Sequence, residues 1–448
     1  MGQLYAGFSR VDITPPLGIE IGGYFVKRIA DGVLDNLTVS ALSLELDGKE
    51  LLLLSADLLG LYTSAETILD KVAQSQNLPK ESVYIHCTHT HTGPKLSAIQ
   101  PGSLEEDYLE QLMMKFCDAA TLARADRKPA KMGYGIGQAP NVAFVRRFRM
   151  KDGSVRTNPG VNNPDIVAPI GDVDERVTIL RFDREGAETL LLVNFANHPD
   201  VVGGCKISAD WPGLLCKTVE KALDNTKCIF FNGAQGDVNH VNVHPTGGYL
   251  NDMFMDFDDV ARGYAHARYI GRVVTGGVLQ AFDKVKYMVP DALRFGQKVI
   301  QVPANLPDPA EMEEAHRIHQ LHLAGKDDQI PYTGMMLTTV VARAGRMVRL
   351  ENGPEYFDMR LSAIAVGDIA LVGIPGEPFT GIGRALKETK EWEMVIPTCL
   401  TNGAVGYFPM MECYVEGGYE AGSSPFKAGV AERIIEAGQT LLSDLRKE

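Results

Sequence analysis

The sequence lacks the features by which membrane and secreted proteins are recognised. No apolar run approaches the ~18 residues that a membrane-spanning helix needs, and one of the most apolar stretches, 51–61, is interrupted by Ser55 and Asp57. The N-terminus has no basic region followed by an apolar core, and the chain shows no amphipathic anchor or basic patch for a membrane surface. These absences predict a cytoplasmic protein without a membrane anchor.

Cysteine and positive charge are also scarce. The chain of 448 residues has seven cysteines, no Cys-x-x-Cys pair and a formal net charge of −13. An odd, irregularly spaced set of cysteines predicts reduced thiols that pack as small hydrophobic side chains. The negative charge argues against a nucleic-acid partner, because phosphate binding needs clustered lysines and arginines.

The residues that are present predict a globular α/β protein. Apolar residues make up 45% of the chain and charged residues 23%, as is typical of soluble folded domains. Predicted strands alternate with predicted helices over 64–76 and 104–125, and Asp47-Gly48 between two β-prone runs predicts a hairpin. No linker divides the chain. We therefore expect a single large α/β domain over 1–448, with mixed β-sheets flanked by α-helices.

Two histidines follow a short apolar run, Val83-Tyr84-Ile85. If the run is a strand that continues past it, His89 and His91 lie on one face and point at one place, whereas His86 faces away. Neutral imidazole is the commonest metal ligand in proteins. The pair could equally be two hydrogen-bonded polar residues at a strand end, so a metal site requires further ligands from elsewhere in the chain.

Other predicted strands also carry polar residues at their ends. His198 follows the apolar run 189–195, and Glu377 follows the run 368–372 and a Pro-Gly turn. Asp57, at the end of another strand, is a candidate to orient a ligating histidine. Glu377 also fits an ordinary acidic residue ahead of the helix predicted from Thr380 to Lys390.

Taken in chain order, these motifs resemble the neutral/alkaline (non-lysosomal) ceramidase family. The matching segments are Asp12-Ile13-Thr14, Gly23-Tyr24, His89-Thr90-His91-Thr92-Gly93-Pro94, Asn197-His198-Pro199, Gly236-Asp237-Val238, Pro375-Gly376-Glu377 and the tyrosine-containing stretch 402–420. They resemble the zinc-dependent N-terminal catalytic domain of the family. Few residues follow Tyr419, so the C-terminal immunoglobulin-like domain of the family is expected to be absent.

The resemblance implies a metal centre and its ligands. One zinc ion per chain would be held by the side chains of His89, His198, Glu377 and Tyr407. Two imidazoles, a carboxylate and a phenol form a nitrogen and oxygen donor set that suits Lewis-acid hydrolysis.

The resemblance also implies catalytic residues around that centre. His91 would transfer a proton or stabilise an oxyanion, and Tyr419 would donate to the developing oxyanion. Arg146 is the nearest match to the arginine with which the family contacts its substrate. Asn239 stands where the family has a serine. An amide can donate a hydrogen bond to an oxyanion but cannot act as a nucleophile, which favours a zinc-activated water as the attacking group.

The function implied is that of a zinc-dependent hydrolase that cleaves the C–N amide bond of a small N-acyl molecule. The absence of a membrane anchor argues against the lipid ceramide itself as the substrate. Two alternatives remain open from the sequence: a zinc-dependent esterase or lactonase, and a metal-binding scaffold that has lost catalysis. The acyl chain, the amine and the oligomeric state are not indicated by any motif.

Overall fold

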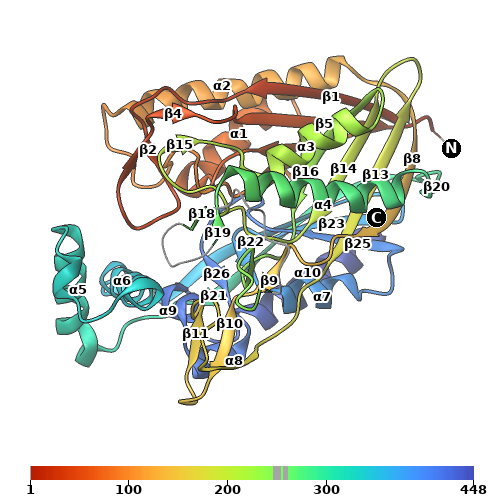
Figure 1. Ribbon diagram of the computed structural model, residues 1–448. Helices are drawn as coiled ribbons and strands as arrows, with labels where there is room; N and C mark the ends of the chain where they lie inside the picture. Colours follow the sequence, from red (N-terminus) through yellow and green to blue (C-terminus); the bar gives the residue numbers. More distant parts are fainter. Residues whose placement is uncertain (1, 246–253, 256–260, 448) are drawn as a thin grey trace.

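Two β-sheets form the centre of the protein in the computed structural model, which describes residues 2–245, 254–255 and 261–447 (Figure 1). In this part of the chain the larger sheet has nine strands, with the order β16-β14-β13-β8-β1-β5-β6-β7 and β20 paired to β8. Its strands are β1 (Tyr5–Asp12), β5 (Thr38–Leu46), β6 (Lys49–Ala56), β7 (Val83–Cys87), β8 (Lys128–Gln138), β13 (Arg176–Arg184), β14 (Thr189–Phe195), β16 (Thr226–Asn232) and β20 (Lys286–Met288). The smaller sheet contains β21 (Leu293–Pro303), β22 (Tyr356–Val366), β23 (Ile369–Gly373) and β25 (Met394–Thr398).

Helices cover the outer faces of the two sheets. Those on the larger sheet are α1 (Ala65–Gln76), α2 (Leu104–Ala125), α3 (Asp210–Ala222) and α4 (Tyr264–Phe282); those on the smaller sheet are α7 (Thr380–Lys387) and α10 (Val430–Lys447). The inner faces of the sheets pack against each other through residues such as Leu53, Leu192, Ile364 and Leu371. The result is a helix–sheet–sheet–helix arrangement, which confirms the predicted α/β class with mixed sheets. The domain boundaries stay a prediction.

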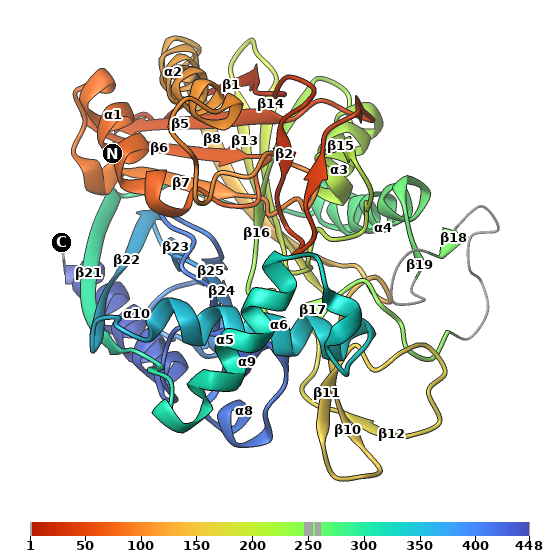
Figure 2. The same ribbon diagram turned by 90° about the vertical axis from the view of Figure 1, so that its left-hand side faces the viewer.

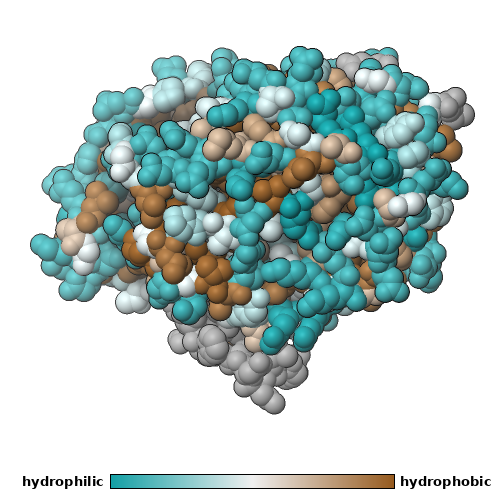
Figure 3. Space-filling view, turned by 90° about the horizontal axis from the view of Figure 1, so that it is seen from above, coloured by the Kyte–Doolittle hydropathy of each residue, from teal (hydrophilic) through white to brown (hydrophobic). Residues whose placement is uncertain are grey.

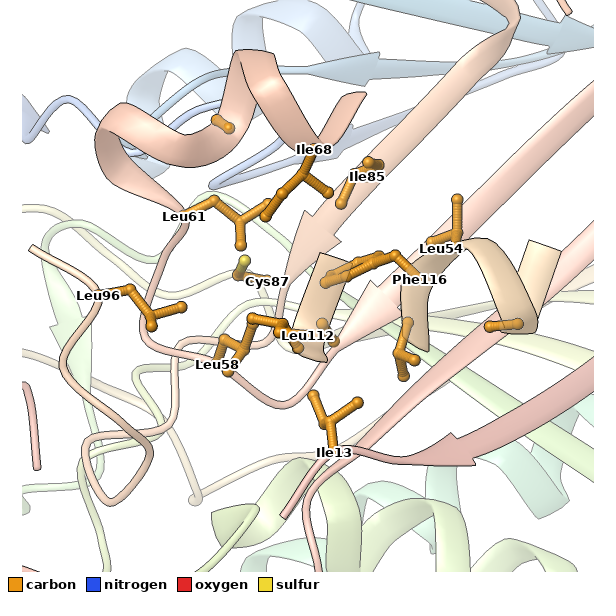
Figure 4. Close-up of a cluster of buried hydrophobic side chains, with 14 of the residues drawn as sticks. Ile13, Leu54, Leu58, Leu61, Ile68, Ile85, Cys87, Leu96, Leu112 and Phe116 are labelled. Carbon is orange, nitrogen blue, oxygen red and sulfur yellow. The ribbon is translucent and has the colours of Figure 1, made fainter. Parts of the chain in front are cut away.

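Both faces of the strands in the larger sheet are buried. In β6, Leu51 and Leu53 pack toward the smaller sheet, whereas Leu52 and Leu54 pack toward α1 and α2. Figure 4 shows the second of these clusters, in which Leu54 and Ile85 lie with Phe116 of α2. Burial on both faces explains why this strand reads as a continuous apolar run instead of an alternating one.

The predicted hairpin joins β5 to β6. Asp47 and Gly48 both have positive φ, 51° and 79°, as a two-residue turn between twisted antiparallel strands requires. The register places Leu46 opposite Lys49 on the two sides of this turn. The helices predicted over 64–76 and 104–125 are confirmed as α1 and α2.

Ser103 caps the N-terminus of α2. Its side-chain oxygen accepts a hydrogen bond from the Glu106 amide at 3.3 Å, so one of the free N–H groups of the first turn is satisfied. Replacing Ser103 by alanine is expected to lower the free energy of unfolding by about 1 kcal/mol. Urea denaturation measures this change; an unchanged midpoint would show that solvent replaces the cap without cost.

Four further α-helices and a set of short strands complete the described part of the fold. The remaining helices are α5 (Met312–Leu323), α6 (Gly334–Leu350), α8 (Met411–Glu416) and α9 (Tyr419–Ser423). The remaining strands are β2 (Glu20–Ile21), β3 (Arg28–Ile29), β4 (Gly32–Val33), β9 (Phe144–Val145), β10 (Arg147–Met150), β11 (Val155–Thr157), β12 (Ile166–Pro169), β15 (Lys206–Ile207), β17 (Val238–Asn239), β18 (Phe254–Met255), β19 (Ala261–Arg262), β24 (Glu377–Pro378) and β26 (Tyr407–Phe408). The pair α5 and α6 projects from the left side of the protein in Figure 1 and lies at the front in Figure 2.

The two sheets are joined where several strands end. The amide of Cys399, after β25, donates to Asn232 at the end of β16, and the amide of Asn402 donates to Ile85 of β7. The segments after β7, β14, β16 and β23 therefore meet in one region. Ends of strands are where α/β proteins commonly place their binding residues.

Candidate metal centre and active site

Three buried histidines meet in this region. His89, His91 and His198 each offer one ring nitrogen, and these nitrogens lie within 4.8 Å of one another. His89 and His91 follow β7, and His198 follows β14. Elsewhere in the described part of the chain no group of three histidine, cysteine or acidic side chains has such spacing. The predicted meeting of these histidines is confirmed.

The prediction that His89 and His91 meet because they share one face of a strand was wrong. Strand β7 ends at Cys87, and His89 has a left-handed backbone with φ of 78°, so the two histidines do not share a strand face. Backbone hydrogen bonds hold the loop instead: the His89 amide donates to Leu58, and the His91 amide donates to Pro199. The second bond ties this loop directly to the segment that carries His198.

The δ nitrogens of two histidines are held by backbone carbonyls. His89 Nδ1 lies 2.7 Å from the Leu59 carbonyl oxygen, and His198 Nδ1 lies 3.5 Å from that of Gln235. Each Nδ1 is placed to donate to its carbonyl, which leaves the lone pair on Nε2 free to bind a metal. The carbonyl of Leu59 thus has the orienting role that the sequence suggested for Asp57. The Asp57 carboxylate instead accepts from the amide and hydroxyl of Thr38, so that assignment was wrong.

Glu377 completes the cluster from the smaller sheet. Its Oε2 lies 3.3 Å from His89 Nε2 and 3.7 Å from His198 Nε2. Strands β24 and β26 pair in parallel with Glu377 opposite Tyr407, so the two proposed ligands are neighbours in one short ladder. Gln235 donates to the same Glu377 oxygen at 3.4 Å.

These distances fit a tetrahedral metal ion. Two ligand atoms at ~2.0–2.1 Å from zinc, separated by the tetrahedral angle, lie about 3.3 Å apart. The measured separations of 3.3 and 3.7 Å from Glu377 Oε2 are close to this value. With Nδ1 of His89 donating to Leu59, the Nε2 lone pair faces a carboxylate oxygen. Two acceptors so close repel unless a proton or a metal cation lies between them. Burial alone would lower the pKa of His89, but Glu377 outweighs it and raises that pKa, so the two side chains share a proton. A metal ion can take the place of this proton, and the donor set therefore fits a metal.

Burial and neighbouring charges set the protonation of the cluster. Burial lowers the pKa of His91 to about 3, although Asp200 acts in the opposite direction. Burial alone would raise the pKa of Glu377, but His89, His198 and Arg146 outweigh it and hold that pKa well below its usual range. Glu377 is therefore an anion and His91 a neutral imidazole near pH 7.

Two tyrosines lie beside the cluster. The rings of Tyr407 and Tyr419 meet edge to face with centroids 5.6 Å apart. Burial and the nearby charge of Glu377 raise the pKa of both phenols above the ordinary value. Each phenol therefore keeps its proton unless a metal cation lies next to it.

Arg146 lies against both tyrosines but is also part of a buried ion pair. Its guanidinium carbon is 5.2 Å from the Tyr407 ring centroid, and its Nε is 2.7 Å from Glu420 Oε1. The guanidinium also donates to the Gly236 carbonyl at 2.6 Å. The side chain lines a cavity next to the cluster, which leaves substrate contact as a prediction.

Asn239 lies behind Asn158 as seen from the cavity. Its amide nitrogen donates to Asn158 at 3.0 Å, and its oxygen accepts from the Val241 amide at 3.0 Å. Asn158 lines the cavity next to His198. The predicted oxyanion contact of Asn239 stays a prediction, with Asn158 placed between Asn239 and the cavity lining.

Three residues of the site were not identified from the sequence. Asp200 Oδ1 lies 3.7 Å from His91 Nδ1 and accepts from the Tyr24 hydroxyl at 2.5 Å, and Gln235 binds Glu377 as described above. Asp200 directly follows the Asn197-His198-Pro199 motif, and Tyr24 lies in the quoted Gly23-Tyr24 pair. For Asp200 and Tyr24, the available signal in the sequence was their position in or next to a motif of the resemblance.

Two cavities open beside the histidines. The larger, about 880 Å³, is lined by His89, His91 and Glu377 and extends to the end of α6. The smaller, about 420 Å³, is lined by His91, His198 and Arg146 and extends to Met335, Leu337 and Val341 of α6. Gly23, Tyr24, Phe25, His91, Tyr407 and Tyr419 line both. The cluster therefore lies between two arms of one site.

Exposed hydrophobic side chains lie near the smaller arm. They gather in the segment 17–34, which includes Phe25 and Val26 of the cavity lining. Figure 3 shows hydrophobic residues on the left of the face seen from above, the side on which β2 and β4 lie in Figure 1. No helix in the described part of the chain has the length and apolar character to cross a membrane.

Comparison with known proteins gives structural matches alone. No protein-family model matches the chain, and no curated protein matches it. The crystal structure of neutral ceramidase from Pseudomonas aeruginosa matches 100% of this chain and 75% of that chain, with a TM-score of 0.74 and 16% identity. The chain has the neutral ceramidase fold. A ceramidase complexed with C2 also matches, with 17% identity, a TM-score of 0.74 and coverage of 100% of this chain and 76% of that chain.

The fold and the motifs thus lead to the same comparison independently. The ceramidase fold was found from the whole backbone, whereas the resemblance was inferred from short motifs in the sequence. Within this ceramidase fold, the motif residues His89, His198, Glu377 and Tyr407 lie around one point or line the adjoining cavity.

Gly236 allows the close approach of Glu377 in this ceramidase fold. A Cβ atom at Gly236 would lie 2.5 Å from the Glu377 carbonyl oxygen, which belongs to the backbone of β24. Gly236→Ala should displace Glu377 and weaken metal binding at the cluster by about 10- to 100-fold, as loss of support around a metal ligand does. Competition with a chelator measures the affinity. Gly276→Ala on α4, where a Cβ atom meets open space, is the control and should bind as the wild type does.

Proposed function

We propose that the protein is a zinc-dependent hydrolase that cleaves the C–N amide bond of a small N-acyl molecule. The observation that carries the proposal is that Glu377 Oε2 lies 3.3 Å from His89 Nε2 and 3.7 Å from His198 Nε2, separations that suit ligands of one tetrahedral zinc ion. Tyr407, opposite Glu377 in the β24–β26 ladder, is the fourth proposed ligand. Ceramidases, whose fold the chain has, support the choice of an amide.

Zinc in such a donor set is a Lewis acid that lowers the pKa of a bound water toward neutrality. Around it, the residues of this chain have distinct tasks. His91 is a neutral imidazole, and its Nε2 lies 3.3 Å from His89 Nε2. It is placed to accept a proton from the attacking water and to return it to the leaving amine. Tyr419, which keeps its phenolic proton, is placed to donate to the oxyanion that forms on the carbonyl oxygen.

The two cavity arms support a substrate with two parts. A hydrolase for an N-acyl molecule must hold an acyl chain on one side of the scissile bond and an amine on the other. The smaller arm ends among Met335, Leu337 and Val341, which suit an apolar chain. Charged side chains line both arms, for example Asp327 in the smaller and Arg349 in the larger, so each arm also offers contacts to a polar group. Ceramide is one member of this class.

Turnover of matched amides and esters tests the proposal. The zinc-loaded protein should hydrolyse N-acyl amides faster than the O-acyl esters with the same chains. A chelator should abolish the activity, and added zinc should restore it. Faster cleavage of the esters would indicate an esterase or lactonase. Absence of turnover with zinc bound would indicate a metal-binding scaffold.

A further inference from the structure

The wall of the larger cavity contains a cation without a partner. Arg349, in the last turn of α6, lines this cavity together with His89, His91 and Glu377. Within the described part of the chain, Arg349 makes no hydrogen bond and no ion pair. The other cation in the lining, Lys95, is paired with Glu20 at 2.7 Å. Arg349 is therefore the cation of this cavity that remains available to a ligand, as far as the structure describes it.

The pairing of the other arginines of α6 makes this position unusual on the helix. On α6 itself, Arg343 is paired with Glu311 at 2.7 Å, and Arg346 donates to the carbonyls of Gly422 and Asn305. The protein carries an excess of acidic residues, with a net charge of −13, so carboxylates for pairing are abundant. A cation at the C-terminal end of a helix is favourable for the helix dipole, but this does not require that it line a cavity.

The surroundings of Arg349 suit a bound anion. Its side chain is accessible to solvent, yet the protein around it is dense enough to lower its pKa by burial. A carboxylate in the lining, Asp358, accepts from Gln301 and forms no ion pair with Arg349. A guanidinium so placed can bind a carboxylate through two parallel hydrogen bonds.

Helix α6 is fixed relative to the reaction centre. One turn before Arg349, Arg346 Nε donates to the Gly422 carbonyl at 2.9 Å, and Gly422 belongs to α9, the helix that begins with Tyr419. Three residues of an α-helix span about 4.5 Å along its axis. The position of Arg349 is thus tied through one short helix to the proposed oxyanion donor.

We propose that Arg349 forms a subsite for a carboxylate carried by the half of the substrate that occupies the larger arm. The substrate is then an anionic N-acyl molecule, in which the carboxylate belongs either to the amine half or to the acyl half. This inference rests on the proposed amide hydrolysis for the identity of the ligand. The cation on the cavity wall is its independent basis.

Matched pairs of substrates test the subsite. N-dodecanoyl derivatives of glycine, β-alanine and γ-aminobutyrate are compared with their neutral carboxamides. The monobutylamide of sebacic acid is compared with its neutral carboxamide in the same way. For each pair, kcat/KM of the anion is divided by kcat/KM of its neutral carboxamide. The pair with the largest ratio shows which half of the substrate carries the carboxylate and how far it lies from the amide. The wild type should prefer one anion by about 10- to 100-fold.

Variants of α6 then assign the preference to one residue. Arg349→Met should reduce the ratio to about one, and Arg349→Lys should keep part of it because the charge remains without the planar fork. Arg343→Met, on the same helix but outside the cavity lining, is the control and should keep the wild-type ratio. A preference that survives in Arg349→Met would overturn the subsite, as would a wild-type ratio near one.

Binding separates this proposal from the proposed hydrolysis. N-(dodecylsulfonyl)glycine, in which a sulfonamide replaces the scissile amide, and its neutral carboxamide are titrated into the zinc-loaded protein by calorimetry, with the longer homologues in parallel. Three results together would keep the subsite and reject the hydrolase proposal: the anion binds more tightly than its carboxamide, this difference disappears in Arg349→Met, and none of the N-acyl substrates is hydrolysed. If none of these compounds is bound or hydrolysed, the subsite is overturned.

Discussion

The double variant His89→Ala/His198→Ala is expected to hydrolyse N-acyl amides at least about 1,000-fold more slowly than the wild type. Removal of two imidazoles leaves Glu377 and Tyr407, which are too few ligands to hold zinc at micromolar concentration. The loss of Lewis-acid stabilisation is worth several kcal/mol, and three orders of magnitude correspond to about 4 kcal/mol. Initial rates at saturating zinc, with bound zinc measured in the same samples, check this result.

Two other histidines provide a matched control for that experiment. His316 and His319 lie on α5 and outside the three-histidine group, and His316 is paired with Glu351 at 3.0 Å. The variant His316→Ala/His319→Ala should keep the wild-type rate and zinc content. A rate in the first double variant that equals that of this control would refute the ligand assignment.

The second large effect concerns stability. Glu420→Ala should lower the free energy of unfolding by about 3–5 kcal/mol, because it leaves the guanidinium of Arg146 buried without its anion. Arg146 is 5% exposed and Glu420 is 0% exposed, and Nε of the first lies 2.7 Å from Oε1 of the second. Glu420 also accepts from the Thr157 hydroxyl at 2.8 Å. Urea denaturation measures the loss.

A double variant separates the ion pair from the packing around it. Arg146→Met/Glu420→Met removes both charges and keeps apolar volume, so it should lose less stability than Glu420→Ala. If the double variant is the less stable of the two, the buried charges are not the cause. The Arg146 substitution also bears on substrate contact, since a structural role alone would leave KM unchanged in the folded fraction.

Local sequence patterns predicted the elements but not the reason the site forms. Asp47-Gly48 predicted a hairpin because a two-residue turn between antiparallel strands needs positive φ at both residues, and this residue pair adopts it readily. The two-residue periodicity of a strand did not predict the orientation of His89 and His91, because His89 itself has a left-handed backbone after the end of β7 and changes the direction of the chain. The hydrogen bond from the His91 amide to Pro199, which brings two distant loops together, has no counterpart in any local pattern.

Partners that are far apart in the chain were the hardest to predict. Family resemblance named Glu377 and Tyr407 as ligands, yet their pairing in one parallel ladder is visible only in the fold. Asp57 was suggested to orient a histidine because it ends a strand, but the partner of His89 Nδ1 is the carbonyl of Leu59, two residues further along the chain. Arg349 carries no motif, and its proposed role follows from the cavity that it lines. Glu420 ends the motif stretch 402–420, yet its pairing with Arg146 is visible only in the fold.

The central claim is that these side chains hold one zinc ion, and elemental analysis of the purified protein tests it most directly. The protein is expressed with zinc, dialysed against metal-free buffer and measured by mass spectrometry beside its His89→Ala/His198→Ala variant. The account predicts about one zinc per chain in the wild type and nearly none in the variant. Equal metal content in the two proteins, or a wild type without bound metal after growth in zinc, would contradict it.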